Sequence, residues 1–258
     1  MRIDYFEGRM VDMDPIFEAV LVSDEAVAQL LRRSPDLSQA RIGQDHLVET
    51  IPHWLYVEDT PLHLAAAALR TEAAKLLLES GANVNAENRR GATPLHYACD
   101  PRPQSGGTWD PAKQGELIEL LVQHGAKLER VDRGGASALH RAVRARSPAA
   151  VRQLLKAGAR VDIRLGKHGS TPIHLAVQST GASGTAGAIN EQLEIIVMLL
   201  QHGADPAAKD ARGRSALDWA TNERVSAALQ KSPDHLLGRE GSSSKVGRAG
   251  RKGRPTSS

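Results

Sequence analysis

The stretch that decides the fold is Thr60-Pro61-Leu62-His63-Leu64-Ala65, because close copies of it return along the chain. The copies are Thr93-Pro94-Leu95-His96-Tyr97-Ala98, Ser137-Ala138-Leu139-His140-Arg141-Ala142, Thr171-Pro172-Ile173-His174-Leu175-Ala176 and the less similar Ser215-Ala216-Leu217-Asp218-Trp219-Ala220. They begin 33, 44, 34 and 44 residues apart, so two intervals fit a unit of 33 residues and two carry an insert of 11. A period of this length indicates a chain of stacked structural repeats.

The same local pattern surrounds each copy. Thr or Ser can cap the free amides at a helix start, and Pro at the first helical position loses no hydrogen bond. A second apolar run follows and ends at Gly, as in Leu76-Leu77-Leu78 before Gly81. Only 11 or 12 residues separate that Gly from the next Thr or Ser. We therefore expect each unit to be two short helices plus a hairpin-like turn. The units must stack, because one helix pair cannot bury its own apolar face.

The Thr-Pro-Leu-His-x-Ala signature and its 33-residue period resemble the ankyrin repeat over residues 14–230. The resemblance implies an all-α solenoid of stacked helix-turn-helix units joined by β-hairpin-like turns. It also implies a non-catalytic adaptor or regulator that binds a partner protein through its turn tips and inner helices. In this family the histidine of the signature braces the turn by hydrogen bonding. Leu69 departs from the family pattern, because it stands where the chain usually turns with Gly.

The repeats divide the chain into four segments. These are an N-terminal segment (1–59) with a degenerate capping repeat and a lengthened connection, four ankyrin repeats (60–214) with inserts near 100–110 and 180–190, a C-terminal capping repeat (215–230) and a disordered basic tail (231–258). In the first segment Asp14 is expected to cap a helix entered by Pro15, and residues 51–57 to form a lengthened hairpin.

The net charge is distributed unevenly along the chain. The 258 residues carry a net charge of +3, and only 3% of them are aromatic. Six cations and one acid lie between Arg239 and Ser258, a balance of +5 that leaves −2 for the rest of the chain. The tail could therefore bind nucleic acid weakly and in a salt-dependent way, although it lacks aromatic residues for stacking. Solubility is an equally good explanation for its charge.

Several classes of protein do not fit the sequence. Cys99 is the only cysteine, so an intrachain disulfide cannot form. Met1 to Arg9 show no apolar run typical of a secretory signal, and no stretch approaches the ~18 apolar residues of a membrane span. We expect a cytoplasmic monomer with no membrane partner.

Basic residues recur at the expected turn tips and are the candidate contacts for an acidic partner protein. They are Arg89, Arg90, Arg133, Lys167, His168 and Arg212. A competing contact is Trp109 in the first insert, where an aromatic side chain could anchor a partner. The alternative is that both features are surface residues without a binding role.

The sequence favours neither a metal site nor catalysis. His63, His96, His140 and His174 occupy equivalent positions in successive units. Helices pack ~8–10 Å apart, whereas two imidazoles on one zinc ion need ring nitrogens within ~4 Å. No phosphate-binding glycine loop or nucleophile elbow is present, so we expect no catalytic residue and no cofactor. An enzyme with its site on an insert remains an alternative.

Overall fold

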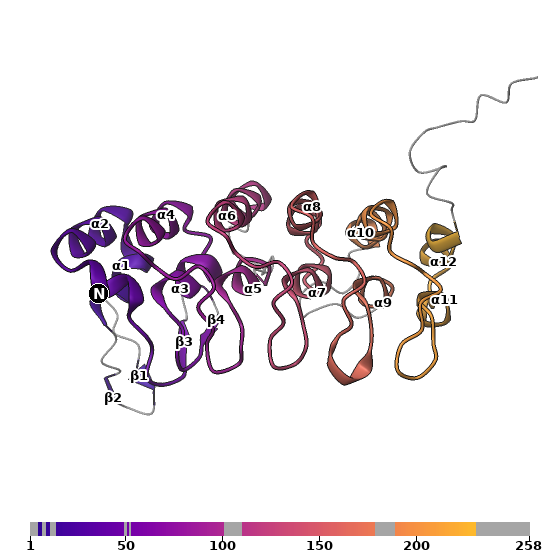
Figure 1. Cartoon of the computed structure of the whole chain (residues 1–258), viewed down its shortest axis with the longest axis horizontal. Coiled ribbons are helices and arrows are strands. Elements are labelled where there is room, and N and C mark those ends of the chain that lie inside the picture. Colours follow the sequence, from indigo (N-terminus) through magenta and orange to yellow (C-terminus); the bar gives the residue numbers. More distant parts are fainter. Residues whose placement is uncertain are drawn as a thin grey trace, which may run out of the picture.

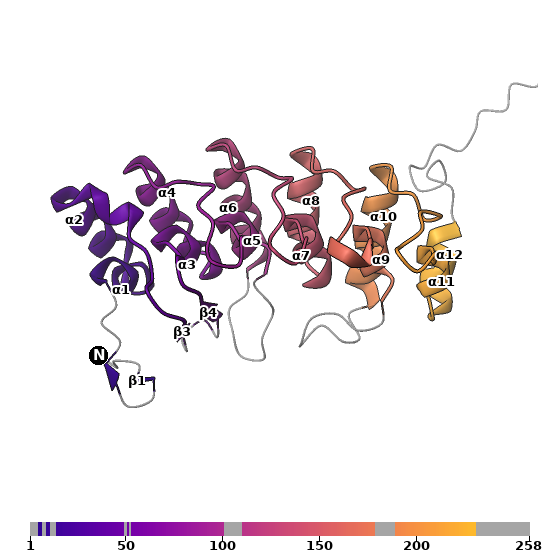
Figure 2. The ribbon, with the colours of Figure 1, turned by 60° about the horizontal axis from the view of Figure 1, so that its bottom comes forward.

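The helices of this protein lie in two rows that run the length of the molecule (Figure 1). The computed structural model describes residues 5–6, 9–10, 14–48, 51, 53–100, 110–178 and 189–230. Turns project from one side of the two rows, below them in Figure 1. Figure 2 shows the same order of helix pairs from a second direction.

Each unit contributes one helix to each row. The inner row contains α1 (Pro15–Val22), α3 (Pro61–Ala67), α5 (Pro94–Ala98), α7 (Ala138–Arg144), α9 (Pro172–Ala176) and α11 (Ala216–Trp219). The outer row contains α2 (Asp24–Arg33), α4 (Thr71–Glu79), α6 (Pro111–Gln123), α8 (Pro148–Lys156), α10 (Ile189–Gln201) and α12 (Glu223–Gln230). Neighbours pack within each row, as α3 does on α5 and α6 on α8. The predicted all-α solenoid is confirmed.

The remaining elements are short and lie before α1 or in the connections between helices. They are the 3-10 helices η1 (Pro35–Gln39) and η2 (Gly166–His168), and the strands β1 (Tyr5–Phe6), β2 (Arg9–Met10), β3 (His46–Val48) and β4 (His53–Leu55). Strands β3 and β4 pair antiparallel, with His46 opposite Leu55 and Val48 opposite His53. The connection before Thr60 thus holds a two-stranded hairpin whose strands span 46–48 and 53–55, whereas the sequence predicted a hairpin over residues 51–57.

Asp14, which the sequence predicts as a cap, and Asp110 both lie at helix N-termini. Asp14 Oδ1 accepts a hydrogen bond from the Ile16 N–H at 3.1 Å, at the start of α1. Asp110 Oδ1 accepts one from the Ala112 N–H at 2.9 Å, at the start of α6. Each carboxylate satisfies an amide for which the helix itself has no acceptor, and this fixes where the two helices begin.

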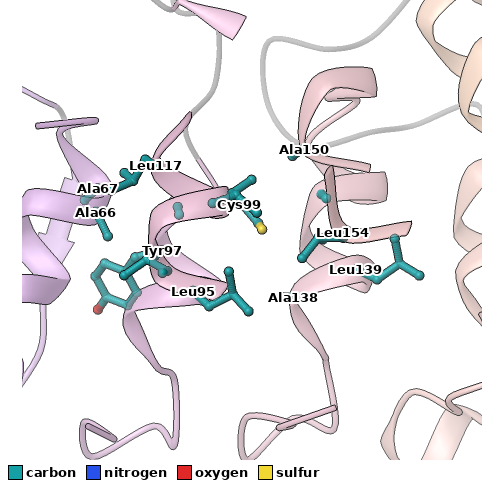
Figure 3. Close-up of a cluster of buried hydrophobic side chains, with 14 of the residues drawn as sticks. Ala66, Ala67, Leu95, Tyr97, Cys99, Leu117, Ala138, Leu139, Ala150 and Leu154 are labelled. Atoms are coloured by element: carbon teal, nitrogen blue, oxygen red, sulfur yellow. The ribbon is translucent and has the colours of Figure 1, made fainter. Parts of the chain in front are cut away.

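The core lies between the rows and continues from unit to unit, as the cluster around α5 and α7 in Figure 3 shows. Leu95, Leu117, Leu139 and Leu154 are each at most 1% exposed. Burying one such side chain stabilises the fold by ~1.5–3 kcal/mol. Alanines such as Ala66 complete each layer and let the helices approach closely. This explains how a chain with few aromatic residues fills its core.

Two turns between helices hold a non-glycine residue in the left-handed backbone region. Leu69 has a φ of 52°, so the leucine adopts the conformation for which glycine is usual. Arg146 has a φ of 56°. Its guanidinium donates to the carbonyl oxygen of Ala176 at 2.8 Å and to that of Gln178. These hydrogen bonds tie the turn of one unit to the end of α9 in the next.

Parts of the chain named in the sequence analysis fall outside the described residues. They are Trp109 with the rest of the first insert (101–109), most of the second insert (179–188) and the basic tail (231–258). Within the part of the chain that the structure does describe, no helix is long and apolar enough to cross a membrane.

Candidate partner-binding surface

The six predicted contact residues lie on the turns that project from the two rows of helices. Arg89, Arg90, Arg133, Lys167, His168 and Arg212 are all exposed. We call this set the turn-tip row. Each residue stands next to a hydrogen-bonded turn that precedes an inner helix, so the repeat itself fixes its place.

Backbone contacts join successive turns of the turn-tip row. The Arg133 N–H donates to the carbonyl oxygen of Arg90 at 2.9 Å, and the Ala211 N–H donates to that of His168 at 3.0 Å. Between these junctions Gly135 and Gly166 approach so closely that a Cβ on Gly135 would lie 2.2 Å from the Gly166 nitrogen. Only glycines fit at this approach. The stacking thus brings residues from four separate turns into one continuous row.

The first two arginines of the turn-tip row contact the preceding hairpin. Arg89 forms an ion pair with Asp45, whose Oδ1 also accepts the Val57 N–H at 3.0 Å. Arg90 lies over the ring of Tyr56, with its Cζ atom 3.8 Å from the ring centroid. A guanidinium over an aromatic face is a cation–π contact that leaves its N–H groups available at the edge. Arg89 is therefore neutralised, whereas Arg90 is held in place with its charge uncompensated.

The carboxylates of the turns are matched mainly by cations outside the turn-tip row. These pairs are Glu58 with Arg41 at 3.9 Å, Glu87 with Arg130 at 3.2 Å, Asp132 with Arg141 at 2.7 Å, Asp162 with Arg160 at 2.9 Å and Asp210 with Arg214 at 3.4 Å. Among the described residues, Asp45 is the one carboxylate that pairs with a member of the row. The turn tips consequently keep an excess of positive charge.

A set of side chains on the inner row, not predicted from the sequence, holds these turns in place. They occupy the variable position of the repeated signature, and each contacts a turn residue nine positions earlier. The pairs are Tyr97 with Asn88 at 3.0 Å, Arg141 with Asp132 at 2.7 Å and Trp219 with Asp210 at 3.0 Å. A polar residue that recurs nine positions after an Asn or Asp would have been a usable signal.

Arg141 links two parts of the chain. Its guanidinium donates to Asp132 at 2.7 Å and to Asp100 at 2.5 Å, and all three side chains are at least four-fifths buried. Burial alone would lower the pKa of Arg141, but the two carboxylates raise it above its ordinary value. Burial likewise opposes ionisation of Asp132, but hydrogen bonds from Arg141 and the Ala136 N–H lower its pKa. Arg141 thus stays charged and fixes the turn that carries Arg133 to the end of α5.

Comparison with known proteins identifies the family to which the chain belongs. A family model described as ankyrin repeats (3 copies) matches residues 16–104 and 112–210, well over half of the chain. The chain belongs to the ankyrin-repeat family. A model of the single ankyrin repeat also matches residues 90–133.

The curated relatives share the ankyrin region and are much longer. The chain is similar to the B-cell lymphoma 3 protein homolog of Mus musculus, 32% identical over 165 residues, which cover 64% of this chain and 33% of that protein. It is also similar to ankyrin repeat and SOCS box protein 16 of Mus musculus, 33% identical over 177 residues, 69% of this chain and 27% of that protein. A shorter match to a Caenorhabditis elegans ankyrin repeat and LEM domain-containing protein 1 homolog is 59% identical over 44 residues, 16% of this chain and 6% of that protein. The chain thus spans a third or less of each relative.

The signature histidines join one ankyrin repeat to the next. The Nδ1 atom of His96 accepts the Thr93 N–H at 3.1 Å, so the ring proton is on Nε2, which donates to the Ala136 carbonyl oxygen at 3.0 Å. His63, His140 and His174 make the equivalent pairs of contacts. The predicted bracing role is confirmed. Because both ring nitrogens are occupied by hydrogen bonds, none of these rings offers a free nitrogen to a metal ion.

The buried histidines and the single cysteine of the ankyrin stack are also poorly suited to metal binding or catalysis. Burial lowers the pKa of His96 and of His140 to about 4, so both rings are neutral near pH 7. Burial also raises the pKa of the Cys99 thiol far above its usual range, and the side chain is fully buried, so a nucleophilic role does not suit it. Within the described ranges, no three His, Cys, Asp or Glu side chains are grouped so that they could hold a metal ion.

Proposed function

We propose that this chain is a non-catalytic adaptor or regulator that binds a partner protein through the turn-tip row and the adjoining inner helices. Ankyrin repeats generally mediate protein–protein interaction. The observation that carries the proposal is the continuity of the turn-tip row, since backbone hydrogen bonds join Arg90 to Arg133 and His168 to Ala211. A rigid row of like charges on four turns suits recognition of an acidic protein surface, because a summed field speeds encounter.

A capture experiment with matched charge reversals tests this proposal. Arg133→Glu with Arg212→Glu alters the turn tips, and Lys75→Glu with Lys156→Glu makes the same charge change at exposed sites on α4 and α8. We expect proteins captured from source-cell lysate to be lost with the tip variant and kept with the outer-helix variant. If both variants keep the same proteins, or both lose them, the turn-tip row is not the binding surface.

The first insert is the competing binding surface, and binding kinetics distinguish it from the turn-tip row. Once a partner is known, Arg89→Glu with Arg133→Glu should slow association and flatten its salt dependence. Trp109→Ala should instead accelerate dissociation if that side chain is a buried anchor worth ~2 kcal/mol or more. Unchanged association and salt slope in the tip variant, together with faster release in Trp109→Ala, would move the proposed contact to the insert.

A further inference from the structure

Four cations of the turn-tip row carry charge that no described carboxylate pairs with. They are Arg90, Arg133, Lys167 and Arg212, which we call the tip cations. Each ion pair of the turns uses other residues, and Arg89 of the row is already matched by Asp45. The tip cations are therefore the part of the row left to attract an anionic ligand.

The tip cations lie one per turn on four successive turns, so they make two neighbouring pairs. Arg90 and Arg133 lie on neighbouring turns whose backbones are joined by the 2.9 Å hydrogen bond from the Arg133 N–H to Arg90. Lys167 and Arg212 lie on the next two turns, where the Ala211 N–H donates to the backbone carbonyl oxygen of His168 at 3.0 Å. Each pair thus presents two cations across one junction between turns.

The segment between the two pairs presents bare backbone. There Gly134 and Gly135 meet Gly166, and a Cβ on Gly166 would lie 2.5 Å from the Gly134 carbonyl oxygen. No side chain can occupy that approach. The two pairs are centred two repeat units apart, about 20 Å if successive units are spaced like packed helices, ~8–10 Å each. An extended peptide covers that distance in about six residues, at ~3.3 Å per residue.

The Arg90 side chain is already held in place before a ligand binds. Its guanidinium lies 3.8 Å from the centroid of the Tyr56 ring, so the side chain does not have to be ordered on binding. A planar guanidinium held in this way can donate two parallel hydrogen bonds to one carboxylate. The pair formed by Arg90 and Arg133 is consequently the better defined of the two.

We propose that the tip cations bind an extended acidic segment of the partner protein that carries two acidic pairs separated by about four uncharged residues. The inference rests on the proposed function and names its ligand. Each acidic pair lies on one pair of tip cations, and the uncharged spacer crosses the glycine junction. A protein ligand fits better than single-stranded nucleic acid, because the Tyr56 ring face that could stack a base is covered by Arg90.

Labelled synthetic peptides test this geometry by fluorescence anisotropy with the full chain. The probe is Glu-Glu, four Gly or Ser residues, then Glu-Glu. The control has the same composition, with the four glutamates in one block. To remove the contribution of the basic tail, both are measured on the chain with Arg239, Lys245, Arg248, Arg251, Lys252 and Arg254 replaced by Gln. We expect the spaced probe to bind about fivefold more tightly, since linked sites gain most when the linker matches their separation.

Two matched variants test the assignment of residues. Arg90→Gln removes an uncompensated charge and should weaken binding of the spaced probe about two- to fivefold. Asp45→Asn with Arg89→Gln removes the adjacent neutralised pair without changing net charge and should leave binding unchanged. Thermal melts show whether each variant is folded, and Arg133→Gln replaces Arg90→Gln if the latter is not.

Three results would overturn the inference. These are equal affinity for the spaced and block peptides, equal effects of Arg90→Gln and the paired variant, and tighter binding of a single-stranded oligonucleotide that depends on Arg90. If no acidic peptide binds while the lysate proteins are still lost with Arg133→Glu and Arg212→Glu, the inference fails and the proposed function stands. If those lysate proteins are retained, the proposed function fails.

Discussion

The hydroxyl of Tyr97 donates a hydrogen bond of 2.7 Å to Asp59 Oδ2, although 38 residues separate them in the chain. Asp59 is fully buried and also accepts the Tyr56 N–H at 2.6 Å and the Asn88 side-chain amide at 2.9 Å. Three partners from two turns and an inner helix therefore satisfy one carboxyl group. This network connects the lengthened hairpin to the second ankyrin repeat.

Tyr97→Phe should lower the free energy of unfolding by about 1.5–3 kcal/mol, because it removes one donor to a buried carboxyl group. Urea denaturation measures the change, with the slope against denaturant expected to stay constant. Tyr56→Phe is the control, since that side chain is half-buried and its hydroxyl makes no hydrogen bond to another described residue. Equal stability of Tyr97→Phe and the wild type would show that the Tyr97 hydroxyl contributes nothing.

Arg141→Met should destabilise the protein by about 2–4 kcal/mol, because it leaves Asp100 and Asp132 without their shared cation in a largely buried setting. The comparison is Arg160→Met, which breaks an exposed ion pair with Asp162. We expect no measurable change there. Similar melting temperatures for the two variants would contradict the structural role of Arg141.

Stability should fall as the pH is lowered from 6.5 towards 4. The pKa of His96 and of His140 is about 4 in the folded chain against 6.5 for an ordinary histidine, so the unfolded chain binds more protons in this interval. The stabilisation is complete above pH 6.5 and is lost as the pH falls through 4. Urea midpoints between pH 7 and 5 measure it, because few carboxyl groups titrate there.

His140→Gln separates this effect from other ionisations. Glutamine can accept the Ser137 N–H and donate to the Ser170 carbonyl oxygen as His140 does, but it does not titrate. We expect a smaller slope of stability against pH in the variant. Parallel curves for the variant and the wild type would show that His140 does not cause the pH dependence.

Deleting residues 215–258 should lower the melting temperature and the solubility, because α11 and α12 cover the last full repeat. Val225 and Leu229 of α12 are at most 4% exposed, and their burial alone contributes ~3 kcal/mol or more. Deleting only residues 231–258 is the control, since both helices remain. If the two deletions melt alike, α11 and α12 do not act as a cap.

Removing metal ions should leave the protein unchanged. His63 and His174 use both ring nitrogens in hydrogen bonds to the backbone of their own and the next unit. We expect the same melting temperature with and without EDTA. A fall of several degrees that added zinc reverses would mean that a metal ion contributes to stability after all.

The resemblance to ankyrin repeats implied the histidine bracing, and the sequence by itself determined the repeat and the helix starts. These features depend on neighbours close in the chain, as when Asp14 caps α1 or Thr93 contacts His96 three residues later. Local geometry is the same in every copy, so a spacing of 33 or 44 residues was enough to place the helices. The sequence also located the turn tips, because each lies between a helix-ending glycine and the next capping residue.

Only the tertiary structure decided which cations at those tips are neutralised. Arg89 and Arg90 are adjacent and chemically alike, yet Asp45 pairs with the first and the Tyr56 ring lies under the second. Their partners come from a hairpin more than thirty positions earlier, brought close by stacking of the units. Arg141 likewise meets Asp100 across 41 residues. A pairing set by tertiary packing leaves no fixed spacing in the sequence, so a local pattern could not reveal it.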